Sequence, residues 1–566
     1  MRKIFLILFA FALFAYGADV EVAKQNAQLF GIWTLIPPLV AIALAFITKD
    51  VILSLFIGVF SGTYMLAVIE NNIFSSIIRA VVGITERIIG SMADSWNAGI
   101  MLQVLTIGGV VALITRMGGT KAIAQYLAKK AKTGVSAQVS TWFMGLLVFF
   151  DDYANALIVG PVMRPVTDRF KISRERLAFI IDATAAPIAG IAIISTWVGY
   201  EISLIKDSYG IIEMTNINAF NIFVETIPYR FYNLFMLFFV LITALMSRDF
   251  GPMYKAQVRA KDGDVLSTND KLVPPDEKEA MEAKEGIELK MSNAIVPILV
   301  LMLASFIGFY LNGLNSLEAG FLEDAKNASS PMPDFSLREA FGAADASVVL
   351  FQAALFATIV AMFMGIYRKI FSISEAINVW LKGWKTMIIT IVILLLAWSL
   401  SSVIKELGTS SYLVALLSDS IPNWLLPSVI FALGSFISFS TGTSYGTMGI
   451  IMPLAVPLAY AVGMANGIDG GDLHQYMIMN IGAVLTGAIF GDHCSPISDT
   501  TILSSMGSGC NHIDHVSTQI FYALTVGAIT ILFGYLLVGF GVSIWITLPL
   551  GLLATFGVVR IFGKKV

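Results

Sequence analysis

Charge is what this sequence has least of. Only 13% of its 566 residues are Asp, Glu, Lys or Arg, which is about half of the roughly one quarter found in soluble domains. The net charge of −3 shows no basic excess, so we expect no nucleic-acid partner. The two cysteines, Cys494 and Cys510, are too few for a disulfide framework. These deficits argue against a soluble domain and against a disulfide-stapled scaffold.

Apolar segments take the place of the missing charge. Hydrophobic residues make up 57% of the chain, and the mean hydropathy is +0.80. Runs of about 18 residues or more recur along its length, long enough to cross a ~30 Å hydrocarbon core. We therefore predict an all-α polytopic membrane protein surrounded by lipid. Its fifteen predicted spans lie near 29–47, 51–69, 98–115, 135–150, 154–165, 177–200, 229–247, 293–312, 345–366, 386–404, 422–439, 446–463, 474–491, 518–540 and 543–561.

The first residues have the pattern of a secretory signal peptide. Arg2 and Lys3 precede a short apolar run, and small residues follow at 15–17. We predict that residues 1–17 are a signal peptide, because the run is too short for a spanning helix. An uncleaved anchor is the alternative. Cleavage would leave the mature N-terminus outside the cytoplasm.

Loop charges give the orientation, because Lys and Arg accumulate in short cytoplasmic loops. With the mature N-terminus outside, every basic cluster falls on the cytoplasmic side, as does the C-terminus. The polar segment 248–292 is predicted to be a cytoplasmic linker between transmembrane halves 29–247 and 293–566. Two amphipathic stretches, 73–89 and 373–381, should lie along the membrane interface. The basic clusters contain Arg116, Lys121, Lys129, Lys130, Lys132, Arg164, Arg169, Lys171, Arg174, Arg176, Arg368, Lys369, Lys382, Lys385, Arg560, Lys564 and Lys565.

Two pairs of segments indicate an internal repeat. "FFDDYANALIVGPVMRP" (149–165) corresponds to "FSTGTSYGTMGIIMPLA" (439–455), and "DATAAPIAGIAIIST" (182–196) to "DHCSPISDTTILSS" (492–505). In the first unit, the loop between the predicted spans 154–165 and 177–200 is basic. Its counterpart in the second unit, between 446–463 and 474–491, has acids and no Lys or Arg. The units therefore face opposite ways across the membrane. This predicts inverted-topology repeats with broken helices and re-entrant hairpins, the construction of many secondary transporters.

Polar breaks in such repeats meet near the bilayer midplane and form the site. Pro187 and Pro496 each remove a helical hydrogen bond and free carbonyls upstream. Carbonyl, carboxylate and hydroxyl oxygens suit a small alkali cation. Arg116 and Arg164 lie at membrane ends, and no Lys or Arg is evident in a span core, which favours a cation over an anion. Glu201 ends the sixth span and is expected at the water interface.

Carboxylates inside spans are the first site candidates, because an acid there costs about 2.5–3.5 kcal/mol. Asp182 and Asp492 are expected to bind Na⁺ and H⁺ in turn, although a structural hydrogen bond is the alternative. Of Asp151 and Asp152, one should cap a half-helix and one should be a site acid. Asn155 could orient a ligand or simply pack.

Further candidates supply oxygens near these carboxylates. Asp499 would share a Na⁺ site with Asp182 and Asp492. His493 is a candidate for proton handling, with a structural histidine as the alternative, and its pairing with Cys494 makes no convincing zinc site. The hydroxyl candidates, for which helix capping is the competing interpretation, are Ser440, Thr441, Thr443, Ser498 and Thr500.

"FGDHCSPISDTTILSS" (490–505), "GCNHIDHVSTQ" (509–519) and the 149–165 motif together resemble the NhaC family of Na⁺/H⁺ antiporters. The resemblance covers the chain from about residue 30 onward. It implies an inner-membrane secondary transporter of the ion-transporter superfamily that exchanges Na⁺ for H⁺ without a cofactor. It also implies these site residues: Asp151, Asp152, Asp182, Asp492, Ser495, Asp499 and Thr500.

Our leading hypothesis is thus a Na⁺/H⁺ antiporter working by alternating access. The alternative is a sodium-coupled organic-anion or amino-acid exchanger on the same scaffold, since relatives include exchangers of malate and lactate. A membrane-embedded hydrolase could use Asp pairs but needs no inverted second unit, and a passive channel would more naturally be a symmetric oligomer. Several inverted-repeat transporters form dimers, so a homodimer is one arrangement that this architecture allows.

Overall fold

The computed structural model describes most of the chain. The described residues are 22, 25–48, 50–69, 71–149, 152–193, 195–214, 217–265, 283–284, 286–324, 335–409, 412, 422–496 and 498–566. The predicted signal peptide at 1–17, Asp151 and residues 266–282 and 285 of the central linker lie outside them, as does the side chain of Asp499.

Helices form nearly all of the described chain. The first half contains η1 (Gly31–Leu35), α2 (Ile36–Thr48), α3 (Val51–Val68), α4 (Ile73–Ala93), α5 (Ser95–Arg116), α6 (Gly119–Lys130), α7 (Gly134–Leu147), α8 (Asp152–Arg169), α9 (Arg174–Asp182), α10 (Ala186–Ala189), α11 (Val198–Ile211), α12 (Ala219–Thr226), η2 (Ile227–Tyr229), α13 (Phe231–Met246), β1 (Arg248–Asp249) and α14 (Gly251–Lys261). The second half contains α15 (Ser292–Asp324), α16 (Leu337–Ala343), α17 (Ala346–Tyr367), α18 (Ile373–Thr386), α19 (Ile388–Glu406), α21 (Leu426–Thr441), α22 (Ser444–Ala465), α23 (Gly470–Cys494), α24 (Asp499–Ser508), α25 (His512–Thr530), η5 (Ile531–Tyr535), α26 (Leu536–Gly539), α27 (Ile544–Phe562) and β2 (Lys564–Lys565).

The prediction of an all-α polytopic membrane protein is confirmed. Within the described residues, ten helices are long and apolar enough to span a membrane, or eleven if α12, η2 and α13, which bend by 47°, count as one. Four of the fifteen predicted spans are not such helices: 135–150, 154–165, 177–200 and 422–439. All four belong to the two repeat units.

The sixth predicted span, 177–200, is the clearest correction. It is no continuous helix, because α9 ends at Asp182, the short α10 follows, and α11 begins only at Val198. Pro187 lies at the start of α10, where the missing N–H costs little. The apolar composition predicted burial correctly but concealed the break.

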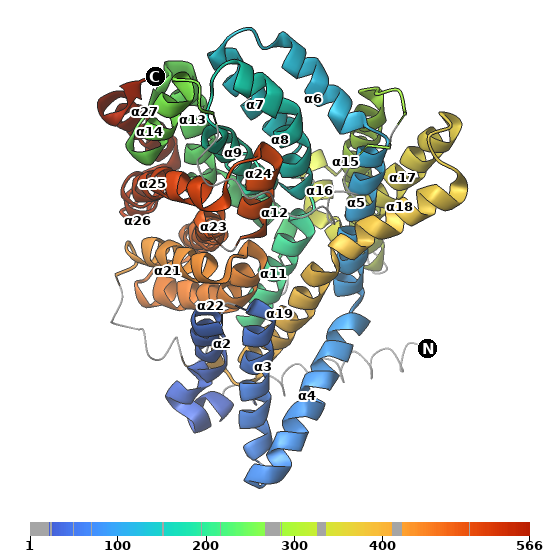
Figure 1. Cartoon of the computed structure of the whole chain (residues 1–566). Helices are drawn as coiled ribbons and strands as arrows, with labels where there is room; N and C mark the ends of the chain where they lie inside the picture. The colour runs from blue at the N-terminus through green and yellow to red at the C-terminus, as the bar shows by residue number, and fades with distance from the viewer. Residues whose placement is uncertain are drawn as a thin grey trace.

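Helical hairpins and broken helices pair up across the halves. In the first half, α7 and α8 form a hairpin beside the break between α9 and α10; in the second, α21 and α22 form a hairpin beside the break between α23 and α24. Figure 1 shows α24 lying against α8 and α9, while α21 and α22 run beside α23. The second unit thus contributes its α24 half-helix to the first hairpin. This interlocking positions the site.

The basic loops gather on one face of the molecule. The C-terminal strand β2 pairs antiparallel with β1, directly after α13. Lys284 donates from its backbone to the carbonyl of Arg116 and from its Nζ to the carbonyl of Ile370. The first part of the predicted linker is also ordered, because α14 packs on α9 and α25. Loops from both halves therefore share the face that carries the C-terminus.

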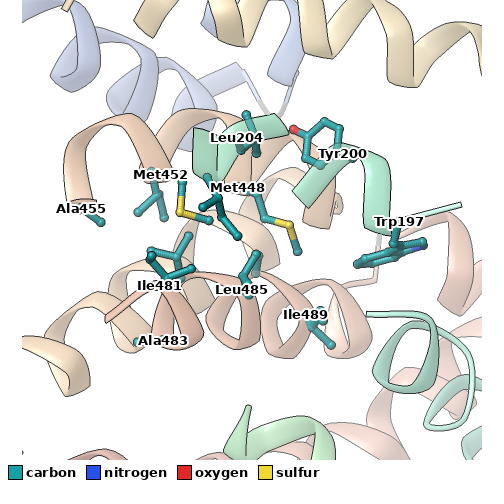
Figure 2. Packing of buried hydrophobic residues seen from close by; sticks show 14 of the residues in the cluster. Trp197, Tyr200, Leu204, Met448, Met452, Ala455, Ile481, Ala483, Leu485 and Ile489 are labelled. Carbon is teal, nitrogen blue, oxygen red and sulfur yellow. The ribbon is translucent and has the colours of Figure 1, made fainter. Parts of the chain in front are cut away.

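The apolar core extends through the second repeat unit. Figure 2 shows Tyr200 and Leu204 on α11 lying against Met448 on α22, with Leu485 and Ile489 on α23 behind. These side chains are 2% exposed or less. Since α22 and α23 are covered on this side by α11, carboxylates at the end of α23 are held away from lipid.

Candidate functional site

The two hairpin tips lie next to the carboxylates of the candidate site. At the second tip, Gly442 adopts φ +67°, a left-handed conformation that favours glycine, and ends α21. Thr443 then caps α22, accepting a hydrogen bond from the N–H of Gly446 at 3.3 Å. At the first tip, α8 begins with Asp152, whose carboxylate lies at the positive end of the helix dipole. Asp152 is 5% exposed.

Asp182 ends α9, and its described hydrogen-bond partners come from the second half. Its Oδ2 accepts from Thr501 Oγ1 at 3.1 Å and from Gln519 Nε2 at 2.6 Å, and its Oδ1 from Ser504 Oγ at 3.4 Å. Thr501 and Ser504 are three residues apart on α24 and so share one helix face. The carboxylate is 1% exposed. One repeat therefore supplies a buried acid, and the other supplies its donors.

Asp492 lies in the last turn of α23, just before the break that separates α23 from α24. Its Oδ2 accepts from Ser444 Oγ at 2.8 Å, and Ser498 also donates to the carboxylate. Ser444 begins α22, so the second hairpin tip holds this acid. Asp492 is 5% exposed. Both mid-membrane acids are thus buried in protein and ringed by hydroxyl groups.

The two acids and Asp152 form one electrostatic group. Asp492 interacts with Asp182 and Asp152, and Asp182 interacts with Asp152. Three buried carboxylates that repel one another need protons or a cation between them. Among the described residues, no three His, Cys, Asp or Glu side chains form a metal-ligand cluster. A cation here would therefore depend on hydroxyl and carbonyl oxygens as well as carboxylates.

A close crossing of two helices brings α24 to the first hairpin. A Cβ on Gly160 of α8 would lie 2.4 Å from the backbone of Gly507 of α24, and one on Gly507 would lie 2.3 Å from the carbonyl of Ala156. Only glycine permits this approach. The guanidinium of Arg164 donates to the carbonyls of Met506 and Gly507 at 2.9 and 2.6 Å, which satisfies the C-terminal end of α24.

Several predicted residues take structural positions around the acids. Asn155, fully buried, donates to the carbonyls of Gly145 and Thr184, which ties the first hairpin to the first break. Its Oδ1 has no partner among the described residues. His493 faces away from Asp492: its Nδ1 lies 2.7 Å from the hydroxyl of Tyr232.

The predicted hydroxyl groups divide between the break and the hairpin tip. Ser495 donates to the carbonyl of Phe439 at 2.7 Å, and Ser498 lies 2.9 Å from Thr500, so these three line the second break. Thr441 donates back to the carbonyl of Ile437 at 2.9 Å, and Ser440 is half-buried beside it. Asp499 begins α24, but its side chain lies outside the described residues.

Two arginines are buried in the protein core, whereas the sequence analysis found no Lys or Arg there. Arg176 and Arg230 are fully buried; Arg176 pairs with Asp249 at 3.0 Å and Arg230 with Glu201 at 2.7 Å. Glu201 is correspondingly buried rather than at the water interface. Arg230 also donates to the carbonyl of Gly190 after the first break. The sequence analysis placed Arg176 in a basic loop and did not single out Arg230.

Gln519 is the partner that sequence reasoning missed. It bridges Asp182 and the carbonyl of His493, and so joins both breaks. A glutamine within the otherwise apolar 518–540 segment was the available signal. Ser504 was also missed, whereas Ser444 and Thr501 lie in the polar stretches 440–444 and 498–501 that the sequence already singles out. Hydroxyl groups on adjacent positions of a helix cannot be ranked without knowing which face meets the acid.

Comparison with known proteins decides the family. The sequence profile described as the Na⁺/H⁺ antiporter family matches residues 1–192 and 188–540. The chain belongs to this family. It is therefore a transporter of the antiporter kind and a multi-pass membrane protein, and the family implies Na⁺ and H⁺ as substrates. The resemblance to NhaC-type sequences is confirmed.

Relatives of this antiporter-family chain include an uncharacterized protein of Haemophilus influenzae, 35% identical over 90% of this chain and 92% of the relative. A malate-2H⁺/Na⁺-lactate antiporter of Bacillus subtilis is 34% identical over 19% of this chain and 20% of its own. Among solved structures, the Alcanivorax borkumensis YdaH transporter (14% identity, TM-score 0.46) covers 76% of this chain and 85% of its own, and Neisseria gonorrhoeae MtrF (12%, 0.48) covers 86% and 84%.

Proposed function

We propose that this antiporter exchanges Na⁺ for H⁺ across the inner membrane by alternating access. One observation carries the proposal: Asp182 of the first repeat unit accepts its hydrogen bonds from α24 and α25 of the second, beside Asp492. A carboxylate held between two units can be exposed to either side when one unit moves against the other. We assign Na⁺ binding to Asp182, Asp492 and Asp499.

Competition for the same carboxylates couples the two ions. When Na⁺ binds, its charge offsets the repulsion between Asp152, Asp182 and Asp492; when Na⁺ leaves, protons take its place. While Na⁺ is bound, the hydroxyl groups of Thr501, Ser504 and Ser444 supply oxygens to it, with their hydrogens rotated away. The exchange needs no group beyond the chain, Na⁺ and H⁺.

An organic anion would need a positive partner, and here the buried arginines count against it. Arg176 and Arg230 are already neutralised by Asp249 and Glu201, so neither offers its charge to a substrate without first breaking an ion pair. This supports a cation as the exchanged species. Transport of malate, lactate or an amino acid remains the competing function.

The test uses everted vesicles from cells that lack their own Na⁺/H⁺ exchangers, with a pH-sensitive dye. Adding Na⁺ should dissipate the proton gradient. Asp182→Asn and Asp492→Asn should each abolish this response, because an amide cannot exchange a proton for a cation. Asp469→Asn, in an exposed loop, is the matched control. A response to malate or lactate and none to Na⁺ would overturn the proposal.

We also propose that the mature N-terminus lies outside and the C-terminus in the cytoplasm. The gathering of Arg116, Lys284 and the β1–β2 pair on one face supports this, since basic residues mark the cytoplasmic side.

A further inference from the structure

A polar cavity lies apart from the carboxylates of the candidate site. It measures about 600 Å³, is open to the outside and is lined by α4, α5, α11 and α19. Four acids and three bases line it: Glu86, Asp94, Asp207, Glu406, Arg87, Lys206 and Lys405. A charged cavity of this size between helices of a membrane transporter is a place where an ion can leave bulk water.

Asp207 is the acid at the wall formed by α11 and α19. Its Oδ2 is buried, and its carboxylate interacts with the hydroxyl of Ser401 and with the ammonium groups of Lys405 and Lys206. Ser203, one turn earlier on α11, accepts a hydrogen bond from Trp398 Nε1 at 2.8 Å. A buried carboxylate oxygen flanked by hydroxyl groups offers hard oxygen ligands.

The basic residues of the cavity already have partners. Arg87 forms an ion pair with Glu406, and the ammonium of Lys206 lies 3.7 Å from the ring centre of Trp96, a cation–π contact. Lys405 interacts with Asp207 from the next helix. With acids in excess, the cavity attracts positive rather than negative solutes.

A continuous series of contacts leads from Asp207 to the acids of the site. Along α11, Ser203 and Tyr200 follow Asp207 at about one-turn intervals. Tyr200 donates to the carbonyl of Tyr445, and the two rings lie 4.5 Å apart. Ser444, the neighbour of Tyr445, donates to Asp492. Figure 2 shows Tyr200 and Trp197 on α11.

We propose that this cavity is a second binding site for the transported monovalent cation, in which Asp207, Ser203 and Ser401 hold the ion before it reaches Asp492. The aromatic side chains of Tyr200 and Tyr445 separate the two sites in this conformation. The proposal rests on the proposed function for the identity of the cation, but the site is defined by its own residues. It assigns to α11 the role of connecting the two sites.

Equilibrium binding of ²²Na⁺ to the purified full-length protein tests the site separately from transport. The parent is the Asp182→Asn/Asp492→Asn variant, which lacks the central acids. It should retain ²²Na⁺ binding. Adding Asp207→Asn should abolish that binding, and adding Asp207→Glu should preserve it. Asp472→Asn, which lines a different cavity of about 640 Å³, is the matched control and should leave binding intact.

Two further results complete the test. In the vesicle assay, Asp207→Asn alone should raise the Na⁺ concentration for half-maximal response about tenfold, as for the loss of one charge-assisted contact. Binding that is unchanged by Asp207→Asn, or lost equally with Asp472→Asn, would overturn the proposal. Binding at Asp207 in a protein that exchanges no protons would support this site and overturn the proposed exchange. Elution volume and melting temperature verify that each variant folds.

Discussion

Glu201 and Arg230 form an ion pair that contacts no solvent. Taking both charges out of water costs several kcal/mol each, and their attraction offsets that cost only while both are present. Arg230 has further acceptors, the hydroxyl of Thr226 at 3.0 Å and the carbonyl of Gly190. The pair therefore fixes the segment after the first break to the start of α13.

Removing one member of the pair should destabilise the protein severely. We expect Arg230→Met to lower the free energy of unfolding by about 3–5 kcal/mol, because Glu201 is then buried without a partner. The double variant Arg230→Met/Glu201→Gln should recover more than half of the loss. Melting curves in detergent measure this. Lys290→Met, which breaks the exposed pair with Glu288, should change stability by under ~1 kcal/mol; an equal loss there would contradict the argument.

The individual site residues could be predicted only partly from the sequence. Asp182 and Asp492 were identified because a carboxylate is costly within an apolar run, a property of the residue itself. Gln519 and Arg230 were not, because their importance comes from partners more than 25 positions away along the chain. Thr443 was selected for its hydroxyl, and its observed contact is a helix cap.

Among the helices, the crossing of α8 and α24 brings the two repeat units into contact. Gly160 and Gly507 meet backbone to backbone, and no flexible side chain can move aside there. A side chain at either position must separate the helices. Because Thr501 and Ser504 lie on the same α24, such a separation would withdraw their hydroxyl groups from Asp182.

Enlarging Gly160 should therefore affect exchange through Asp182. We expect Gly160→Val to abolish the Na⁺-dependent vesicle response and Gly160→Ala to reduce it, with an overpacking cost of about 1–3 kcal/mol. Gly557→Val on α27 is the control, because no described atom lies within 4 Å of a Cβ built there. Full exchange by Gly160→Val would show that the crossing can widen without loss of the site.

The existence of a span was predictable wherever the helices are continuous, although α15 extends to Asp324, well past the predicted end at residue 312. The four predicted spans that failed are those of the hairpins and the first break, where polar residues and prolines interrupt an apolar pattern. Periodicity and hydropathy average over such interruptions. Local rules are expected to fail at functional segments, and here the failures at 135–150, 154–165, 177–200 and 422–439 coincide with the elements that surround Asp182 and Asp492.

At the scale of the whole molecule, the two ends of α5 lie at opposite sides of the membrane. Its 22 residues extend about 33 Å at 1.5 Å per residue, enough to cross the hydrocarbon core. Its first end leads into the cavity through Asp94 and Trp96. Its second end, Arg116, accepts a hydrogen bond from the central linker. In the orientation that we propose, this second end is cytoplasmic.

Labelling of introduced cysteines tests that orientation together with the side from which the cavity opens. A membrane-impermeant maleimide should label Ser95→Cys in intact, outer-membrane-permeabilised cells and Lys130→Cys only in everted vesicles, since both positions are exposed. The unsubstituted protein is the control, because Cys494 is buried and Cys510 is half-buried. Labelling of Lys130→Cys in intact cells would show that the orientation is the opposite of the proposed one. The cavity at Asp207 would then receive cations from the cytoplasm.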